Sequence, residues 1–162
     1  MKALQLTALG RIELREIQEP ALGPGLVKIK MKAAALNRRD EWIKEGKYPN
    51  IRLGVTLGSD GAGVVEQVFD EVNQSWVGQE VVINPNIDWG SDPEVQSKYY
   101  TILGMPFDGT FAEYAVVPVD RIHKIPAHLN AIQAAALPLG GLTAYRALFR
   151  RGNLNAGQNV LI

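Results

Sequence analysis

The sequence predicts a mostly β, barrel-like domain over residues 1–126, followed over residues 127–162 by the first helices and the first strand of an α/β domain. Two observations lead to this division. Up to Pro126 the chain consists of short strand-like runs that are rich in Val and bounded by Gly or Pro. From His128 two helical patterns follow, and the sequence then closes with the apolar run GQNVLI, which is typical of a buried strand.

The runs of the first part indicate an antiparallel sheet. KALQLTAL and RIELREI are separated by Gly10, and LVKIKM alternates apolar and polar residues as a half-buried strand does. GAGVVEQV, GQEVVINPN and GTFAEYAVVP are Val-rich and favour a twisted sheet that closes on itself. The stretch from Ile87 to Asp108 is too long and too mixed for a hairpin turn, so we expect a surface lobe there.

Three helices are expected. The segment NRRDEWIKEG predicts a short one with Asn37 as the N-cap, Asp40 in its first turn and Gly46 at its C-terminal end. Asn130 and Gln133 stand at capping-box spacing before an Ala-rich helix. That helix ends at a proline, and a second amphipathic pattern runs from there to Gly152. Its members are Leu142, Tyr145, Leu148 and Phe149.

Composition excludes several functional classes. The chain has 162 residues with 17 Lys+Arg against 17 Asp+Glu, and no run of like charges, so neither nucleic acid nor a membrane surface is an expected partner. The absence of Cys excludes disulfides, thiolate zinc sites, iron–sulfur clusters and a cysteine nucleophile. No apolar stretch approaches the roughly 18 residues of a membrane helix, and we expect a cytoplasmic protein.

Two motifs are judged structural. LGSDGAGVVEQV, residues 57–68, has closely spaced glycines but leads into strand-like text and not into a helix, so it predicts a tight strand entry and not a dinucleotide loop. Within it, Asp60 is interpreted as a buried structural carboxylate held by an arginine. His123 and His128 are the only histidines, and two ligands without a third make a weak metal site, so we expect one strand and one loop histidine.

The segment NRRDEWIKEGKY is the richest in chemistry. It places an amide, two guanidiniums, a carboxylate and a phenol around one short helix, in Asn37, Arg38, Arg39, Asp40 and Tyr48. Taken singly, the amide is most simply a cap and the charged residues a solvated face. Amides and phenols after a sheet can also hydrogen-bond a carbonyl oxygen while remaining neutral, so the cluster is a candidate substrate wall.

Several segments in order resemble the medium-chain dehydrogenase/reductase superfamily. LGPGLVKIKMKAAALNRRD, VGQEVVI and GTFAEYAVVP are similar to its GroES-like catalytic domain, LGSDGAGVVEQV to its Gly-His-Glu-x-x-Gly region, and AALPLGGLTAYRAL to the helix that leads into its nucleotide domain. The resemblance implies a GroES-like domain over residues 1–126 and the start of a Rossmann domain over residues 127–162. Zinc-type alcohol dehydrogenase-like and quinone oxidoreductase-like members are the most similar.

The departures from the zinc-dependent members indicate that both zinc ions are absent. Asn37 stands where those enzymes place their first catalytic cysteine, Ser59 and Asp60 replace their His-Glu pair, and the third ligand position falls near Leu139. Asn, Ser and Leu do not make a catalytic zinc site. The stretch between residues 86 and 108 has none of the four cysteines of the structural-zinc lobe.

The zinc-free branch implies hydride transfer from NADPH to a small-molecule quinone or activated alkene. By resemblance, Asn37 and Tyr48 lie near the nicotinamide and the substrate, and we count Asp40 with them as catalytic. Thr143 matches a position that contacts the nicotinamide ring, and Arg38 one that approaches the cofactor phosphates. The identity of the substrate and the choice between NADPH and NADH stay open.

In the family, the strand that NVLI resembles is followed at once by the glycine-rich dinucleotide loop. We therefore expect the N-terminal portion of an oxidoreductase, inactive by itself. Two alternatives stay open. The chain could be a self-standing, non-catalytic assembly or binding module whose last strand pairs with a second copy in a homodimer. It could also be a metal-dependent alcohol dehydrogenase.

Overall fold

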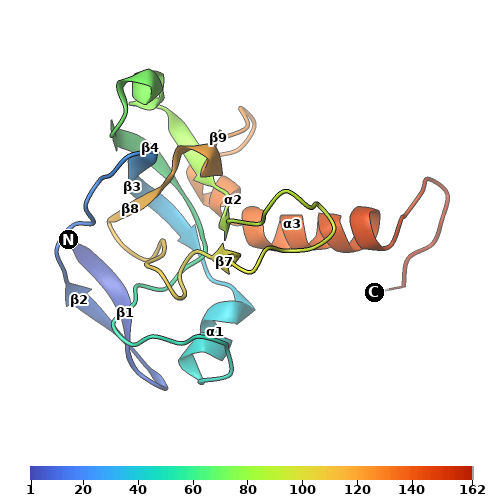
Figure 1. Ribbon diagram of the computed structural model, residues 1–162, viewed down its shortest axis with the longest axis horizontal. Coiled ribbons are helices and arrows are strands. Elements are labelled where there is room, and N and C mark those ends of the chain that lie inside the picture. Colours follow the sequence, from blue (N-terminus) through green and yellow to red (C-terminus); the bar gives the residue numbers. More distant parts are fainter. Residues whose placement is uncertain (162) are drawn as a thin grey trace.

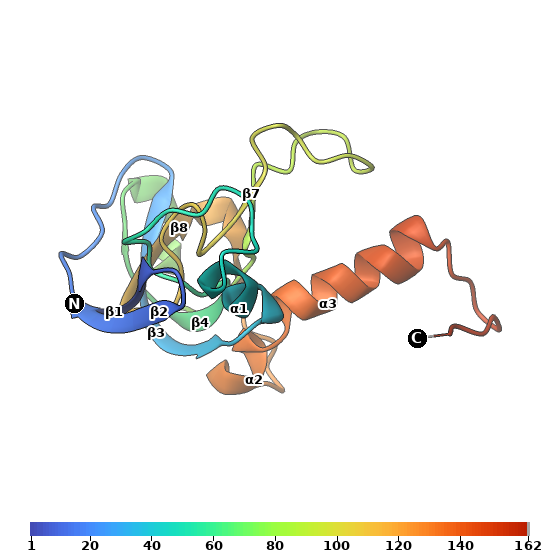
Figure 2. The same cartoon turned by 90° about the horizontal axis from the view of Figure 1, so that it is seen from below.

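The computed structural model describes residues 1–161 and has a β-rich body from which one long helix projects (Figures 1 and 2). Its main sheet has five antiparallel strands in the order β8-β3-β4-β5-β9. These strands are β3 (Leu26–Ala35), β4 (Asp60–Val68), β5 (Glu80–Ile83), β8 (Tyr114–Pro118) and β9 (Ile122–Lys124). Two smaller sheets pair β1 (Lys2–Ala8) with β2 (Arg11–Glu16) and β6 (Asn86–Ile87) with β7 (Thr101–Ile102). The mostly β prediction is confirmed.

The core lies between the sheets because the alternating strand pattern turns one face of each strand inward. Val27 and Ile29 of β3 are fully buried with Val65 of β4 and Val81 of β5. Isolated bridges join β1 to residues 56 and 112, so the small sheet closes one side of the barrel. A second cluster there includes Leu6, Ile43, Val55, Leu57 and Met105 and seats the first helix.

The glycine-rich segment is a tight entry into β4, as predicted. A Cβ atom at Gly63 would collide with the carbonyl oxygen of Lys30 on the neighbouring strand. Gly58 has φ +95°, a conformation that L side chains rarely adopt. Close approach of two backbones, and not phosphate binding, explains these glycines in the described structure.

The first predicted helix is α1 (Arg38–Lys44), with Asn37 as its N-cap. The backbone N–H of Asn37 donates to Asp40 Oδ2 at 2.8 Å, which is one half of a capping box. Gly46, at φ +79°, follows the end of the helix. Short 3₁₀ turns η1 (Glu71–Trp76) and η2 (Val119–Arg121) lie elsewhere, before β5 and β9.

The second part begins with α2 (Ala131–Ala135), whose capping box is formed as predicted. Asn130 N–H donates to Gln133 Oε1 at 3.1 Å, and Gln133 N–H donates to Asn130 Oδ1 at 2.9 Å. Ala134 and Ala135 pack against Ala62 of the barrel. The division at residue 126 stays a prediction.

The long helix consists of α3 (Pro138–Tyr145) and the π-helical segment η3 (Arg146–Arg151), and it extends away from the barrel to Gly152 (Figure 2). Pro138 is its first residue. Proline lacks a backbone N–H, and at this position a backbone N–H would have no partner within the helix. The lobe over residues 88–100 contacts this helix, since Arg146 donates to the carbonyl oxygens of Pro93 and Glu94 at 2.8 Å each and stacks on Trp89.

The expected terminal strand is not formed among the described residues. Residues 158–161 have no regular structure, and Val160 and Leu161 are exposed. A strand needs a neighbour to satisfy its backbone hydrogen bonds, and none is beside this segment in the described part of the chain. Ile162, the last residue of that expected strand, lies outside the described residues. Within residues 1–161, no helix has the length and apolar character required to span a membrane.

Candidate functional site

The inner face of α1 brings charged groups into the protein interior. Its buried residues are Arg39, Asp40 and Ile43. Arg39 is only 6% exposed and Asp40 only 5%. The interpretation of these two as a solvated face is therefore wrong. Ile43 follows Arg39 by about one helical turn and packs in the second core cluster. The two side chains therefore lie on the same face of α1, and that face is buried. Arg38, by contrast, is exposed.

Arg39 is the centre of the site. Its Nε donates to the phenol oxygen of Tyr48 at 2.9 Å, and its Nη1 donates to Ser59 Oγ at 2.8 Å. The guanidinium also lies over the Tyr48 ring, with its central carbon 4.7 Å from the ring centroid. The guanidinium thus joins α1, the segment after it and the entry to β4.

The remaining donors of Arg39 hold the base of the lobe. Nη1 donates to the carbonyl oxygen of Leu103 at 3.0 Å, and Nη2 donates to those of Ile102 and Met105 at 3.1 and 2.9 Å. With Tyr48 and Ser59, these contacts engage all five N–H groups that a guanidinium carries. Nothing in the short helix pattern alone specified this role; the signal available was the helical spacing between Arg39 and Ile43.

Asp60 is buried as expected, but its partners are not arginine. Its Oδ2 accepts from Asn37 Nδ2 at 3.0 Å, and its Oδ1 accepts from the Leu139 N–H at 2.9 Å. Leu139 is the second residue of α3, where unpaired N–H groups favour a negative charge. Burial raises the pKa of Asp60, and the bond from Asn37 opposes this shift. Asp60 therefore links α1 to the start of α3.

Asp40 is a second buried carboxyl group beside it. Burial raises the pKa of Asp40, while the backbone N–H of Asn37 and the charge of Arg39 act in the opposite direction. Within the described residues its Oδ1 has no hydrogen-bond partner. The nearby charge of Asp40 also raises the pKa of Asp60. Asn37 thus contacts two buried carboxyl groups whose pKa values are both raised, chiefly by burial.

A cavity of about 580 Å³ opens between the lobe, the end of β5 and the long helix. Tyr100, Ile102, Leu139 and Thr143 are among its lining residues. Two of them contact the buried network through their backbones, Ile102 by accepting from Arg39 and Leu139 by donating to Asp60. The network therefore lies directly behind one wall of this cavity.

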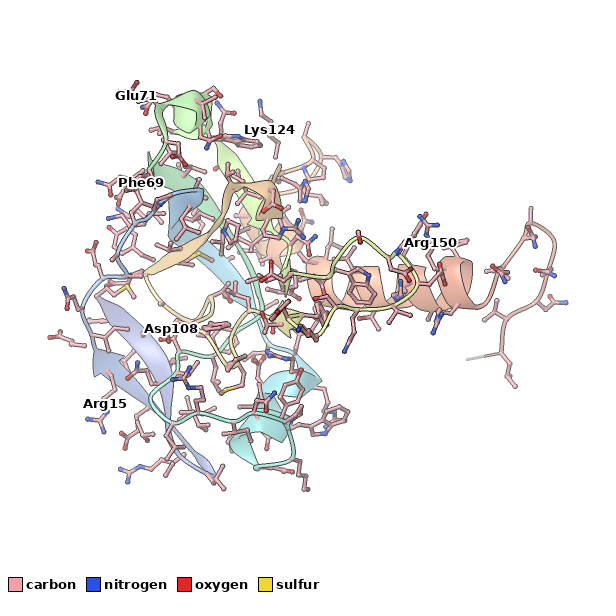
Figure 3. All side chains as sticks on the ribbon, viewed as in Figure 1. Arg15, Phe69, Glu71, Asp108, Lys124 and Arg150 are labelled. Carbon is pink, nitrogen blue, oxygen red and sulfur yellow. The ribbon has the colours of Figure 1, made fainter. Side chains whose placement is uncertain are left out.

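The part of the cavity along the end of the long helix is basic. Arg146, Arg150 and Arg151 line it from the long helix, and Figure 3 shows Arg150 on the part of that helix that extends beyond the barrel. Arg151 is paired with Glu94 of the lobe at 3.3 Å. Arg146 is also engaged by the carbonyl oxygens of Pro93 and Glu94, so the lobe already offsets part of the positive charge of this end of the cavity.

The structure brings some of the predicted site residues together and separates others. Asn37 and Asp40 meet beside Asp60, whereas Tyr48 belongs to a separate set of hydrogen bonds centred on Arg39. Thr143 is an exposed residue on α3, where it lines the cavity and donates to the Leu139 carbonyl oxygen at 2.7 Å.

Comparison with known proteins agrees with this fold. The family model described as "Alcohol dehydrogenase GroES-like domain" matches residues 23–127. The chain belongs to this family. It is 36% identical over 161 residues to the zinc-type alcohol dehydrogenase-like protein YogA of Leptosphaeria maculans, an alignment covering 93% of this chain and 45% of that protein. The predicted membership of the medium-chain dehydrogenase/reductase superfamily is confirmed.

Solved structures give the same result. A crystal structure of an NAD-dependent alcohol dehydrogenase matches with a TM-score of 0.86 and 34% identity, over 97% of this chain and 49% of that one. A quinone oxidoreductase of Pseudomonas syringae matches with a TM-score of 0.72 and 31% identity, over 96% of this chain and 42% of that one. The chain thus spans about half the length of the relatives it matches.

The chemistry of the three positions that resemble zinc ligands does not fit a catalytic zinc ion. At the three positions that resemble zinc ligands, the Asn37 amide donates to Asp60, Ser59 Oγ accepts from Arg39, and Leu139 has an aliphatic side chain. His123 and His128 are an exposed strand and an exposed loop residue, as predicted. The described residues contain no group of three or more His, Cys, Asp or Glu placed to hold a metal.

Proposed function

We propose that this chain is the catalytic domain of a zinc-independent, NADPH-dependent oxidoreductase that reduces quinones or activated alkenes. The observation that carries the proposal is a pair of hydrogen-bond donors, Asn37 and Tyr48, each of which is held by a buried side chain. The Asn37 amide and the Tyr48 phenol are neutral hydrogen-bond donors, and both are fixed by buried partners, Asp60 and Arg39. Neutral donors that are fixed in advance stabilise an oxygen that gains negative charge.

Each of the two donors keeps a proton for a ligand. The amide nitrogen of Asn37 carries two N–H groups, and one of them is used by Asp60. Tyr48 accepts from Arg39 through its oxygen and retains its own O–H. Bound NADPH would supply a hydride to an alkene carbon conjugated with a carbonyl group. Asn37 and Tyr48 would donate to the carbonyl oxygen as it gains the electron pair, and a proton from water would complete the reduction.

The other predicted residues have supporting roles in this proposal. Asp40 fixes the backbone of Asn37 through the 2.8 Å bond from its N–H. Thr143, which lines the cavity, would contact the nicotinamide ring, and the exposed Arg38 would approach the cofactor phosphates. The quinone oxidoreductase among the similar structures supports the proposed substrate class.

Alcohol oxidation is the second candidate, and the similarity to an NAD-dependent alcohol dehydrogenase favours it. The two functions differ in what must polarise the substrate oxygen. An alcohol dehydrogenase of the zinc type requires a metal at the positions of Asn37, Ser59 and Leu139, whose side chains are already committed or apolar. The quinone and enone reaction requires only the neutral donors that are present.

The test measures the full-length protein with NADPH and 1,4-benzoquinone or an enone, and separately with NAD⁺ and primary alcohols, each with and without a chelator. We expect chelator-resistant reduction, lowered by roughly 10²-fold in Tyr48→Phe. The exposed Tyr99→Phe is the matched control. Alcohol oxidation that is lost with the chelator and restored by zinc would overturn the proposal.

A further inference from the structure

The phenol of Tyr48 is held from one side. Arg39 Nε donates to its oxygen at 2.9 Å, and the guanidinium covers its ring. The phenol oxygen is therefore an acceptor in this contact. Among residues 1–161, no hydrogen bond from the Tyr48 O–H is formed, and the side chain is half-buried, so its proton can be offered to a ligand.

Arg39 has no freedom to reach a ligand itself. Besides Tyr48 it donates to Ser59 Oγ and to the carbonyl oxygens of residues 102, 103 and 105, and it is only 6% exposed. Five donors meet five acceptors at 2.8 to 3.1 Å. The positive charge can therefore act on the site only through the groups that it touches. Two of these carry a hydroxyl group, and Tyr48 is the one that a ligand can reach, because Tyr48 is half-buried whereas Ser59 is fully buried.

We propose that Arg39 is a positioning residue for the reduction. Arg39 donates to the Tyr48 oxygen and so fixes the phenol ring. The O–H of Tyr48 then stays available to donate a hydrogen bond to the substrate oxygen. A hydrogen bond from a cation onto a donor oxygen also polarises its O–H and strengthens the bond it gives. The role rests on the proposed function, but the Arg39–Tyr48 contact can be tested without it.

The same guanidinium sets the position of Tyr48 relative to the cavity. It binds the carbonyl oxygen of Ile102, a residue of the cavity wall. The next aromatic residue of that wall, Tyr100, has a pKa that burial raises, and the neighbouring Tyr48 and Arg39 both influence it. Tyr48 does not itself line the cavity, but Arg39 joins its phenol oxygen to the carbonyl oxygen of Ile102 in the cavity wall.

The first experiment reads the contact directly. The full-length protein is labelled with ¹³C at tyrosine Cζ, and the Tyr48 resonance is assigned with Tyr48→Phe. In Arg39→Gln we expect this resonance to move toward that of a solvated tyrosine, with Arg39→Lys in between, because lysine keeps the charge but not the planar set of donors. The exposed Arg52→Gln is the control. A Tyr48 resonance that is unchanged in Arg39→Gln overturns the proposal.

The second experiment asks whether Arg39 acts through Tyr48. We expect Arg39→Gln to lower kcat roughly 10-fold with KM changed less than about 3-fold, and Arg39→Lys to recover part of the loss. The Arg39→Gln/Tyr48→Phe double variant should be as slow as Tyr48→Phe alone, within about 2-fold, because coupled residues are not additive. If the kcat of the double variant falls by the product of the two single losses, the proposal is overturned. A wild type that reduces neither quinone nor enone refutes the proposed function, whereas the resonance of Tyr48 still decides the contact.

Discussion

Replacing Arg39 with methionine should cost about 3 kcal/mol in the free energy of unfolding. Methionine fills a similar volume but donates no hydrogen bond. Three of the lost bonds are fully buried, those to Ser59 Oγ and to the carbonyl oxygens of Leu103 and Met105. A buried acceptor left without a partner costs about 1–3 kcal/mol, and removing the buried charge offsets part of the sum.

The assay is urea unfolding followed by the fluorescence of the three tryptophans, one of which, Trp42, lies on α1. For a chain of this size, a loss of about 3 kcal/mol corresponds to a fall of roughly 6–12 °C in Tm. The exposed Arg52→Met should change the unfolding free energy by less than about 0.5 kcal/mol. If Arg39→Met also stays within that margin, the five-bond network does not stabilise the fold and the reasoning fails.

The other contacts of the site and the barrel make three more predictions. Asp60→Ala should destabilise the chain by about 1–2 kcal/mol and speed hydrogen exchange at the Leu139 amide; unchanged exchange would show that Asp60 does not cap α3. Gly63→Ala should destabilise by more than about 2 kcal/mol in urea, whereas Gly140→Ala, with open space around it on α3, should stabilise by about 0.5–1 kcal/mol; equal effects would contradict the close strand approach. Burial raises the pKa of Asp40 in the folded state above its value in the unfolded chain. The stabilisation that comes from protonated Asp40 is therefore complete below about pH 4, and it is lost as the pH rises through the folded pKa. The unfolding free energy of the wild type relative to Asp40→Asn should therefore decrease from pH 4 to pH 8, and an increase would mean that Asp40 is stabilised as the anion.

Local patterns in the sequence were sufficient to predict β3, α1 and α2. The alternation in LVKIKM placed Val27 and Ile29 in the core, and the capping residues Asn37 and Asn130 marked the starts of α1 and α2. These features depend on neighbours within a few residues, so the period of burial and the local hydrogen bonds are written in the sequence itself. The same kind of pattern predicts a terminal strand that is not formed over residues 158–161, because a strand depends on a partner that its own sequence does not supply.

Only the tertiary structure decided how the site is connected. The sequence placed Asn37, Asp40 and Tyr48 on one segment, but the buried role of Arg39 depends on carbonyl oxygens more than sixty residues away. Asp60 likewise meets the N–H of Leu139, 79 residues later, and not the arginine that its sequence context suggests. Such contacts satisfy buried polar groups across elements, and which groups meet is settled by the packing of the barrel against α1 and α3. The residue types of the site were thus visible in the sequence, whereas their partners were set by the fold.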